Sequence, residues 1–257
     1  MHRAWLALAI LLCSIARGQA PSYSAAGIVN ASNWSAGPFA PNSVLALFGT
    51  NLSYATDPVT AQEQPGFPLP TSLGGVSVYV SDTLAPLLFV SATQINFLVP
   101  MNLLPGTKPV RVVRQGTTGP EAPIAVIAAA PALFSVSGYA LAADWNAANA
   151  LITPDAPAHP GDIVVLYATG LGKPVPSPGV PDIPTTANPI LALPDLKVTL
   201  AGVPLDPSFI KYAGVTPYWA GLYQLNLLLP DKLPNDPEII VSIANQSSSA
   251  GLKLAVR

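Results

Sequence analysis

An internal repeat constrains the fold of this chain more than any other feature of its sequence. Residues 41–52, PNSVLALFGTNL, recur about 120 residues later as residues 160–171, PGDIVVLYATGL. Further along, QINFLVP at 94–100 is matched by QLNLLLP at 224–230. A period this long is typical of a duplicated domain, because solenoid repeats run about 20 to 50 residues. The two copies share strand and turn residues but no set of reactive side chains, so the sequence predicts architecture better than activity.

The first 20 residues have the pattern of a secretory signal peptide. A short basic start precedes an apolar run at residues 4–15, and small residues suited to cleavage follow at 16–20. Cleavage after Gly18 and cleavage after Ala20 both fit this pattern, although the proline that follows Ala20 disfavours the second. We therefore expect residues 1–20 to be a signal peptide and the mature protein to be secreted, extracellular or held in the cell envelope.

A retained membrane anchor and lipidation are the two alternatives to cleavage. A retained membrane anchor is disfavoured, because the apolar run is shorter than the roughly 20 residues that span a bilayer. Lipidation at Cys13 is disfavoured because the residue before it, Leu12, is large. We expect no membrane span in the mature chain.

Composition excludes several classes of function. Cys13 is the only cysteine, so the mature chain is expected to have no disulfide, no thiolate metal site and no cysteine nucleophile. Charged residues make up only 9% of the chain, against about 25% in a typical soluble domain, and they form no basic patch. We expect no nucleic acid partner and no cofactor. Hydrophobic residues make up 50% of the chain, and a weakly charged surface favours self-association or contact with a partner protein.

Short strands follow one another along the whole chain after the signal, with proline and glycine scattered between them. Several runs alternate apolar and polar residues with period two, as half-buried strands do. Seven short strands in about 110 residues are typical of an immunoglobulin-like β-sandwich. We therefore predict an all-β chain with two tandem immunoglobulin-like domains, at residues 21–131 and 132–257. The expected strands lie at residues 27–30, 44–48, 76–80, 84–90, 95–99, 110–113, 124–127, 139–143, 163–167, 196–200, 208–212, 222–228, 239–243 and 252–256.

Several blocks of the sequence together resemble a known family. They are GIVNAS at 27–32, APNS at 40–43, FGTNL at 48–52, PLPTSLGGV at 68–76, APLLFVSATQINF at 85–97, YATGLG at 167–172 and GLYQLN at 221–226. Over residues 27–257 the chain resembles the Solibacter-type uncharacterised C-terminal domain of exported acidobacterial proteins, whose halves look like the IPT/TIG branch of immunoglobulin-like folds. The resemblance implies a fold and a compartment, but no catalytic residue. Such modules usually end longer proteins, whereas here only the expected signal peptide precedes the module, so we expect any activity to belong to the module itself or to a partner.

Candidate catalytic and metal-binding residues are few. His159 has Asp155 and Asp162 nearby in the sequence, but no GxSxG nucleophile motif accompanies them, and the histidine is expected in a solvated turn. The acidic loop from Asp231 to Glu238 carries oxygen ligands of the kind that calcium prefers, without EF-hand spacing. We predict no catalytic residue and no metal site, and the sequence leaves open whether this loop binds calcium.

Two polar pairs interrupt apolar strands at the same place in each repeat. Gln94 and Asn96, and likewise Gln224 and Asn226, are two residues apart and therefore share one strand face. A pair of amides that recognises a ligand is one interpretation. We favour a structural role in which the amides satisfy backbone groups of a neighbouring loop.

The remaining candidates are aromatic. Tyr218 and Trp219 precede the strand expected at 222–228, where exposed rings would form a platform for a sugar or a protein. The sequence as a whole predicts a secreted, non-catalytic binding or structural module that acts in adhesion, matrix assembly or envelope scaffolding through protein contacts or self-association. The alternative is carbohydrate binding through the aromatic residues near Trp219, and a hydrolase is a third, weaker candidate.

Overall fold

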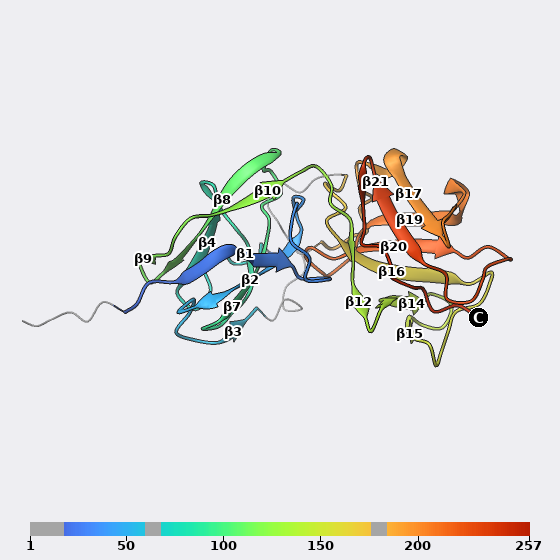
Figure 1. Cartoon of the computed structure of the whole chain (residues 1–257), viewed down its shortest axis with the longest axis horizontal. Coiled ribbons are helices and arrows are strands. Elements are labelled where there is room, and N and C mark those ends of the chain that lie inside the picture. The colour runs from blue at the N-terminus through green and yellow to red at the C-terminus, as the bar shows by residue number, and fades with distance from the viewer. Residues whose placement is uncertain (1–17, 60–67, 176–183) are drawn as a thin grey trace, which may run out of the picture.

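The computed structural model describes residues 18–59, 68–175 and 184–257. Two β-sandwiches lie side by side along the long axis of the molecule, the first drawn from blue to green and the second from yellow to red (Figure 1). The prediction of an all-β chain made of two tandem immunoglobulin-like sandwiches is confirmed. Most of the predicted signal peptide, residues 1–17, lies outside the described residues.

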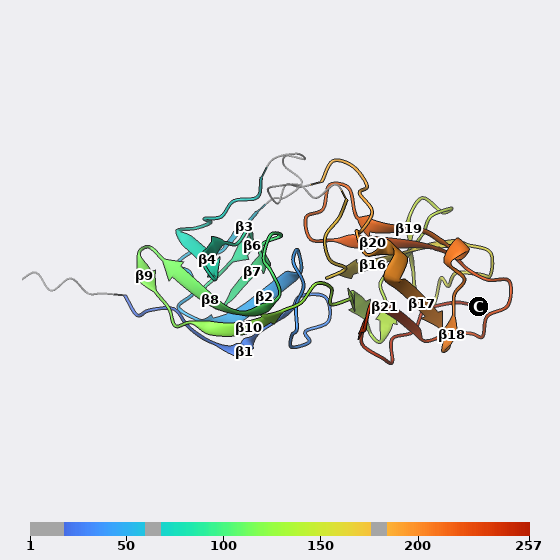
Figure 2. The same cartoon turned by 90° about the horizontal axis from the view of Figure 1, so that it is seen from above.

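The first domain packs one five-stranded antiparallel sheet against a second sheet. The first sheet has the order β1 (Ser22–Asn30), β2 (Val44–Thr50), β7 (Gln94–Leu98), β6 (Leu87–Val90) and β3 (Asp57–Pro58). The second has the order β10 (Ala122–Val126), β8 (Gly106–Arg114), β4 (Val76–Val80) and β5 (Thr83–Leu84), and β9 (Thr117–Thr118) pairs with β8. In Figure 1 the strands β8, β10 and β4 lie above β1, β2, β7 and β3, whereas the two sheets overlap in the view of Figure 2.

The second domain repeats this plan. Its larger sheet has the order β15 (Ala150–Ile152), β14 (Ala142–Asp144), β16 (Ile163–Thr169), β20 (Tyr223–Leu228) and β19 (Ile210–Val215), and β11 (Ala132–Leu133) pairs with β16. The facing sheet has the order β18 (Val203–Pro204), β17 (Leu196–Leu200), β21 (Ile239–Ile243) and β22 (Gln246–Ser247). A small hairpin of β12 (Ser135–Val136) and β13 (Tyr139–Ala140) completes the strands, with 3₁₀ turns η2 (Leu193–Asp195) and η3 (Pro207–Phe209).

Strands whose residues alternate between apolar and polar in the sequence also alternate in burial in the fold. Strands β4, β20 and β21 bury every second residue, because successive side chains of a strand point to opposite faces of the sheet. The buried side chains form two main clusters, one drawn from Ile28 to Val126 and the other from Ala129 to Val256. Each domain therefore has a hydrophobic core of its own. The boundary predicted at residues 131/132 stays a prediction.

Four of the expected strands differ in the structure. The strand expected at 84–90 is divided between β5 and β6, and the strand expected at 139–143 between β13 and β14, with the two parts in different sheets each time. Residues 252–256 make only isolated bridges, to Tyr139, Glu238 and Ala158, and so form no continuous ladder. The start of the strand expected at 208–212 is taken by η3, where Asp206 caps the turn by accepting the backbone N–H of Ser208 at 2.8 Å. Hydrogen bonding from Ser208, first from its side chain and then from its backbone N–H, lowers the pKa of the Asp206 carboxyl. Among the described residues, no helix is long and apolar enough to cross a membrane.

Candidate functional site

The two domains are joined by hydrogen bonds that fix their junction. The hydroxyl of Thr169 on β16 accepts the backbone N–H of Val44 on β2 at 3.1 Å and donates to the carbonyl of Gly221 at 2.9 Å. In the linker, the N–H of Ala130 donates to the carbonyl of Gly170 at 2.8 Å. Backbone groups of both domains are satisfied across the junction, so we expect the domains to move as one body.

Tyr223, one of the largest fully buried side chains among the described residues, lies at this junction. It is fully buried, and this burial raises the pKa of its phenol well above the usual value, so the hydroxyl stays neutral and can donate. The hydroxyl donates to the carbonyl of Gly172 and accepts from Asn42 Nδ2 at 3.0 Å. Asn42 belongs to the first domain, so one buried phenol connects both domains.

A cleft opens beside this junction. Its volume is about 570 Å³, within the range of about 300–1,000 Å³ that is usual for ligand pockets. Most of the lining is apolar, and Lys173 and Asp195 add one charge of each sign. Leu104 from the first domain is 72% exposed and Leu191 from the second is 67% exposed. The lining residues are Pro41, Leu103, Leu104, Pro105, Ile127, Ala128, Ala129, Gly172, Lys173, Leu191, Ala192, Asp195, Ile243, Ala244, Asn245 and Gln246.

Sequence reasoning missed this cleft. Its walls come from the loop between β7 and β8, the linker, the segment around η2 and the turn between β21 and β22, which no motif connects. One feature of the sequence could have indicated the cleft. Leu104 and Leu191 each lie in a proline-containing loop at the end of a sandwich, where polar residues are usual.

The predicted aromatic site lies on the β19–β20 turn. Tyr218 and Trp219 are both about half-exposed, and the turn holds Tyr218 at a left-handed φ of 69°. Gly221, two residues after Trp219, packs so closely on the first domain that a Cβ there would lie 2.4 Å from Leu98 Cδ2. The turn therefore helps to dock the domains and leaves its two rings accessible. Their role in binding stays a prediction.

The four strand amides form two matching pairs on the sheets. Gln94 Nε2 donates to Asn96 Oδ1 at 2.8 Å, and Gln224 Nε2 donates to Asn226 Oδ1 at 3.2 Å. Each pair is partly buried and faces away from the core of its domain, because the residues between them are core residues. The amides thus orient one another within each pair, and the predicted role in holding a neighbouring loop stays a prediction.

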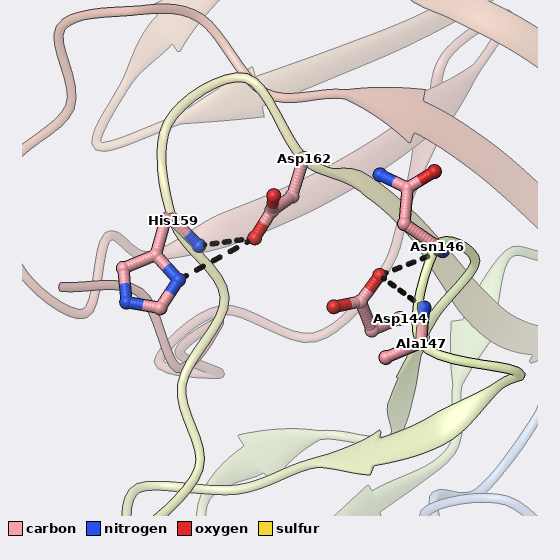
Figure 3. A network of polar contacts seen from close by, with 5 residues as sticks. All are labelled: Asp144, Asn146, Ala147, His159 and Asp162. Carbon is pink, nitrogen blue, oxygen red and sulfur yellow. Dashed lines mark hydrogen bonds and ion pairs between the residues drawn. The ribbon is translucent and has the colours of Figure 1, made fainter.

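Two of the residues considered for hydrolysis, His159 and Asp162, hold one turn together, and Asp144, which was not a candidate, holds another turn (Figure 3). Asp162 Oδ2 accepts the backbone N–H of His159 at 2.7 Å and lies 3.6 Å from its Nδ1, while 68% of the histidine side chain is exposed. Asp144 Oδ1 accepts the backbone N–H groups of Asn146 and Ala147 at 2.8 and 3.3 Å. Both carboxylates are used by their own turns, as the figure shows, and the histidine lies in the exposed turn that the sequence predicts.

Two carboxylates of the acidic loop, those of Asp236 and Glu238, are paired with other groups of the same chain. Asp236 pairs with Arg257 and accepts from the Tyr139 hydroxyl at 3.2 Å, and the hydrogen bond from Arg257 is the main cause of a lowered pKa at Asp236. Glu238 accepts the backbone N–H of Gly251 at 2.6 Å. Within the described parts of the chain, no three His, Cys, Asp or Glu side chains are close enough to hold a metal ion together.

Comparison with known proteins finds no matching family model and no matching curated protein. Solved structures that are similar include the surface glycan-binding protein PbSGBP-B from Prevotella bryantii, at 13% identity over 91% of this chain and a TM-score of 0.27. The Bacteroides ovatus mixed-linkage glucan SGBP-B, solved with a heptasaccharide, is 11% identical over 84% of this chain, with a TM-score of 0.34. This chain spans 42% and 44% of the length of those two proteins. A titin fragment, A168169, is 12% identical over 93% of this chain and all of its own length, with a TM-score of 0.28.

Proposed function

We propose that this protein is a non-catalytic binding module of the cell surface or extracellular space, and that its inter-domain cleft holds an apolar segment of a partner protein. The observation that carries the proposal is the cleft itself, with Leu104 and Leu191 exposed on its two walls. Exposed leucines in a concave site lose unfavourable contact with water when a partner covers them. The expected export of the chain places such a module outside the cell, where adhesion or scaffolding would be its work.

The polar groups of the cleft fit a peptide better than a purely apolar ligand. Lys173 and Asp195 provide one cation and one anion, and Asn245 and Gln246 provide amides. A peptide backbone needs donors and acceptors at the same time as its apolar side chains are buried. The proposal involves no chemical step and assigns no catalytic residue.

The test uses random peptides displayed on phage and selected on the immobilised protein. We expect wild type to enrich peptides with apolar side chains, and we expect Leu104→Asp and Leu191→Asp each to weaken binding of the enriched peptides about tenfold or more, because a carboxylate would be desolvated in the bound state. The matched control is Leu151→Asp, an exposed leucine that does not line the cleft and whose replacement should leave binding unchanged. Absence of enrichment on wild type, or enriched peptides that bind both cleft variants as well as wild type, would overturn the proposal.

Carbohydrate binding at Tyr218 and Trp219 is the second candidate function. It is supported by the exposure of two neighbouring aromatic side chains on one turn. The polysaccharide experiment in the next subsection includes Trp219→Ala and decides between this candidate and the sugar site argued there.

A further inference from the structure

The outward face of the first sheet combines an aromatic side chain with a fixed amide pair. Leu47 on β2 and Ile95 on β7 belong to the core, so Phe48 and Gln94 face the other way. In the register of the two strands, Phe48 is directly opposite Gln94. The Phe48 ring is therefore a lateral neighbour of the Gln94–Asn96 pair on one surface.

Trp34 extends this surface. Its ring centroid lies 5.9 Å from that of Phe48, with the two planes inclined at 47°. The Trp34 side chain is 60% exposed, and Phe48 is also exposed. Two large rings thus contact each other at the surface, beside amides that already have a defined orientation.

The backbone conformation at Trp34 indicates why its side chain is exposed. Trp34 has a left-handed φ of 61°, which is unfavourable for a bulky side chain and well tolerated by asparagine. Its N–H donates to the carbonyl of Asn30 at 2.9 Å, which holds the turn in place. Residues with a strained backbone cluster at binding sites, so a strained residue with an exposed side chain points to a role in binding and not in stability.

The charge of this face limits the ligand. Strands β1, β2, β6 and β7, with the sequences SYSAAGIVN, VLALFGT, LLFV and QINFL, contain no charged residue. The edge strand β3 contains Asp57, which is opposite the core residue Val90 and therefore shares its inward side. A neutral surface gives no attraction to an ionic ligand, so the complementary ligand is uncharged. It must also present an apolar face to the two rings and hydroxyl groups to the amides, which is the chemistry of a pyranose ring.

We propose that Trp34, Phe48, Gln94 and Asn96 form a binding site for an uncharged polysaccharide. The sugar rings stack with their C–H faces on Trp34 and Phe48, and their hydroxyl groups hydrogen-bond to the amide pair. The second domain carries the same amide pair, with Tyr167 opposite Gln224, and an exposed tryptophan at Trp145. Trp145 is therefore the matched control in the second domain. The ring contact on which the proposal rests is that between Trp34 and Phe48 in the first domain.

The experiment is affinity electrophoresis in gels that contain hydroxyethylcellulose, galactomannan or pullulan, with anionic polygalacturonate for comparison. We expect at least one neutral polymer to retard wild type and polygalacturonate not to do so. Trp34→Asn should weaken binding about tenfold or more, since one stacking surface is lost. The same variant should keep or raise the melting temperature, because asparagine tolerates the left-handed backbone. A merely structural tryptophan would show the opposite pattern, with lower stability and unchanged binding.

The remaining variants make the result decisive. Phe48→Ala should also weaken binding, whereas Trp145→Ala and Trp219→Ala should leave it within twofold of wild type. The proposal is overturned if no neutral polymer retards wild type, or if Trp34→Asn binds normally. It is equally overturned if Trp219→Ala abolishes retardation, which would move the sugar site to the β19–β20 turn. Sedimentation showing a dimer that Trp34→Asn dissociates would identify a second copy of the chain as the occupant and would overturn it too.

Discussion

Gly170→Ala is expected to lower the melting temperature by roughly 6–12 °C, which corresponds to a loss of about 3 kcal/mol in the free energy of unfolding. Gly170 has a left-handed φ of 75°, where an L side chain alone costs about 1–2 kcal/mol. In addition, a Cβ at this position would lie 2.2 Å from the carbonyl oxygen of Ala130. Because this neighbour is backbone, the linker has to move, and the hydrogen bond from Ala130 to Gly170 is strained with it.

The matched control is Gly138→Ala. Gly138 has a similar φ of 84°, but a Cβ there would meet nothing within 4 Å. This variant therefore carries the conformational cost alone and should lower the melting temperature by roughly 2–8 °C. Equal losses for the two variants, measured by differential scanning calorimetry, would mean that the junction contributes little to stability.

Arg114→Ala is expected to cost at least about 3 kcal/mol, because two hydrogen bonds from a charged donor are lost together with the packing of a buried side chain. Arg114 ends β8 and is only 2% exposed. Its Nη1 donates to the carbonyl of Asn51, its Nη2 donates to the carbonyl of Gln19, and its guanidinium lies 3.8 Å from the centroid of the Tyr54 ring. The measurement is the free energy of unfolding in urea, followed by tryptophan fluorescence and circular dichroism together so that stepwise unfolding is detected.

Arg111→Ala is the control on the same strand. Arg111 is partly exposed and lies 4.9 Å from the centroid of the Tyr79 ring, so its loss should cost about 0.5–1 kcal/mol. If Arg114→Ala costs no more than Arg111→Ala, the buried guanidinium is not a structural element of this domain. The bond to Gln19 also bears on processing, since a mature chain that starts at Gln19 keeps this acceptor and one that starts at Pro21 loses it.

The fold could be predicted from the sequence because its causes are local and are repeated. Period-two alternation in β4 and β17 follows directly from burial on one face, and the duplicated motifs place the central strand pairs β2–β7 and β16–β20 at equivalent positions. The same reasoning gave the wrong element at residues 252–256. There the alternation predicts that Ala255 faces outward, but Leu254, Ala255 and Val256 are all buried, and the segment contacts three separate parts of the chain by single bridges.

The sites could be predicted only in part, because they depend on how distant segments meet. Gln94 and Asn96 were found from the sequence, since two-residue spacing alone places them on one face. The cleft could not be found, because Leu104 and Leu191 become neighbours of one cavity only through the docking of the two domains. The sequence analysis did not single out Trp34, because its left-handed backbone and its contact with Phe48 appear only in three dimensions.

The central claim is that the two domains are docked as one rigid body, which gives the cleft fixed walls. The most direct test is electron–electron double resonance between nitroxide labels at Thr118→Cys in the first domain and Lys197→Cys in the second. The only native cysteine is removed by Cys13→Ser, so labelling is specific. The account predicts one narrow distance distribution, which broadens when Gly170→Ala is added. A broad distribution in the absence of Gly170→Ala would show that the domains move independently, and it would contradict the account.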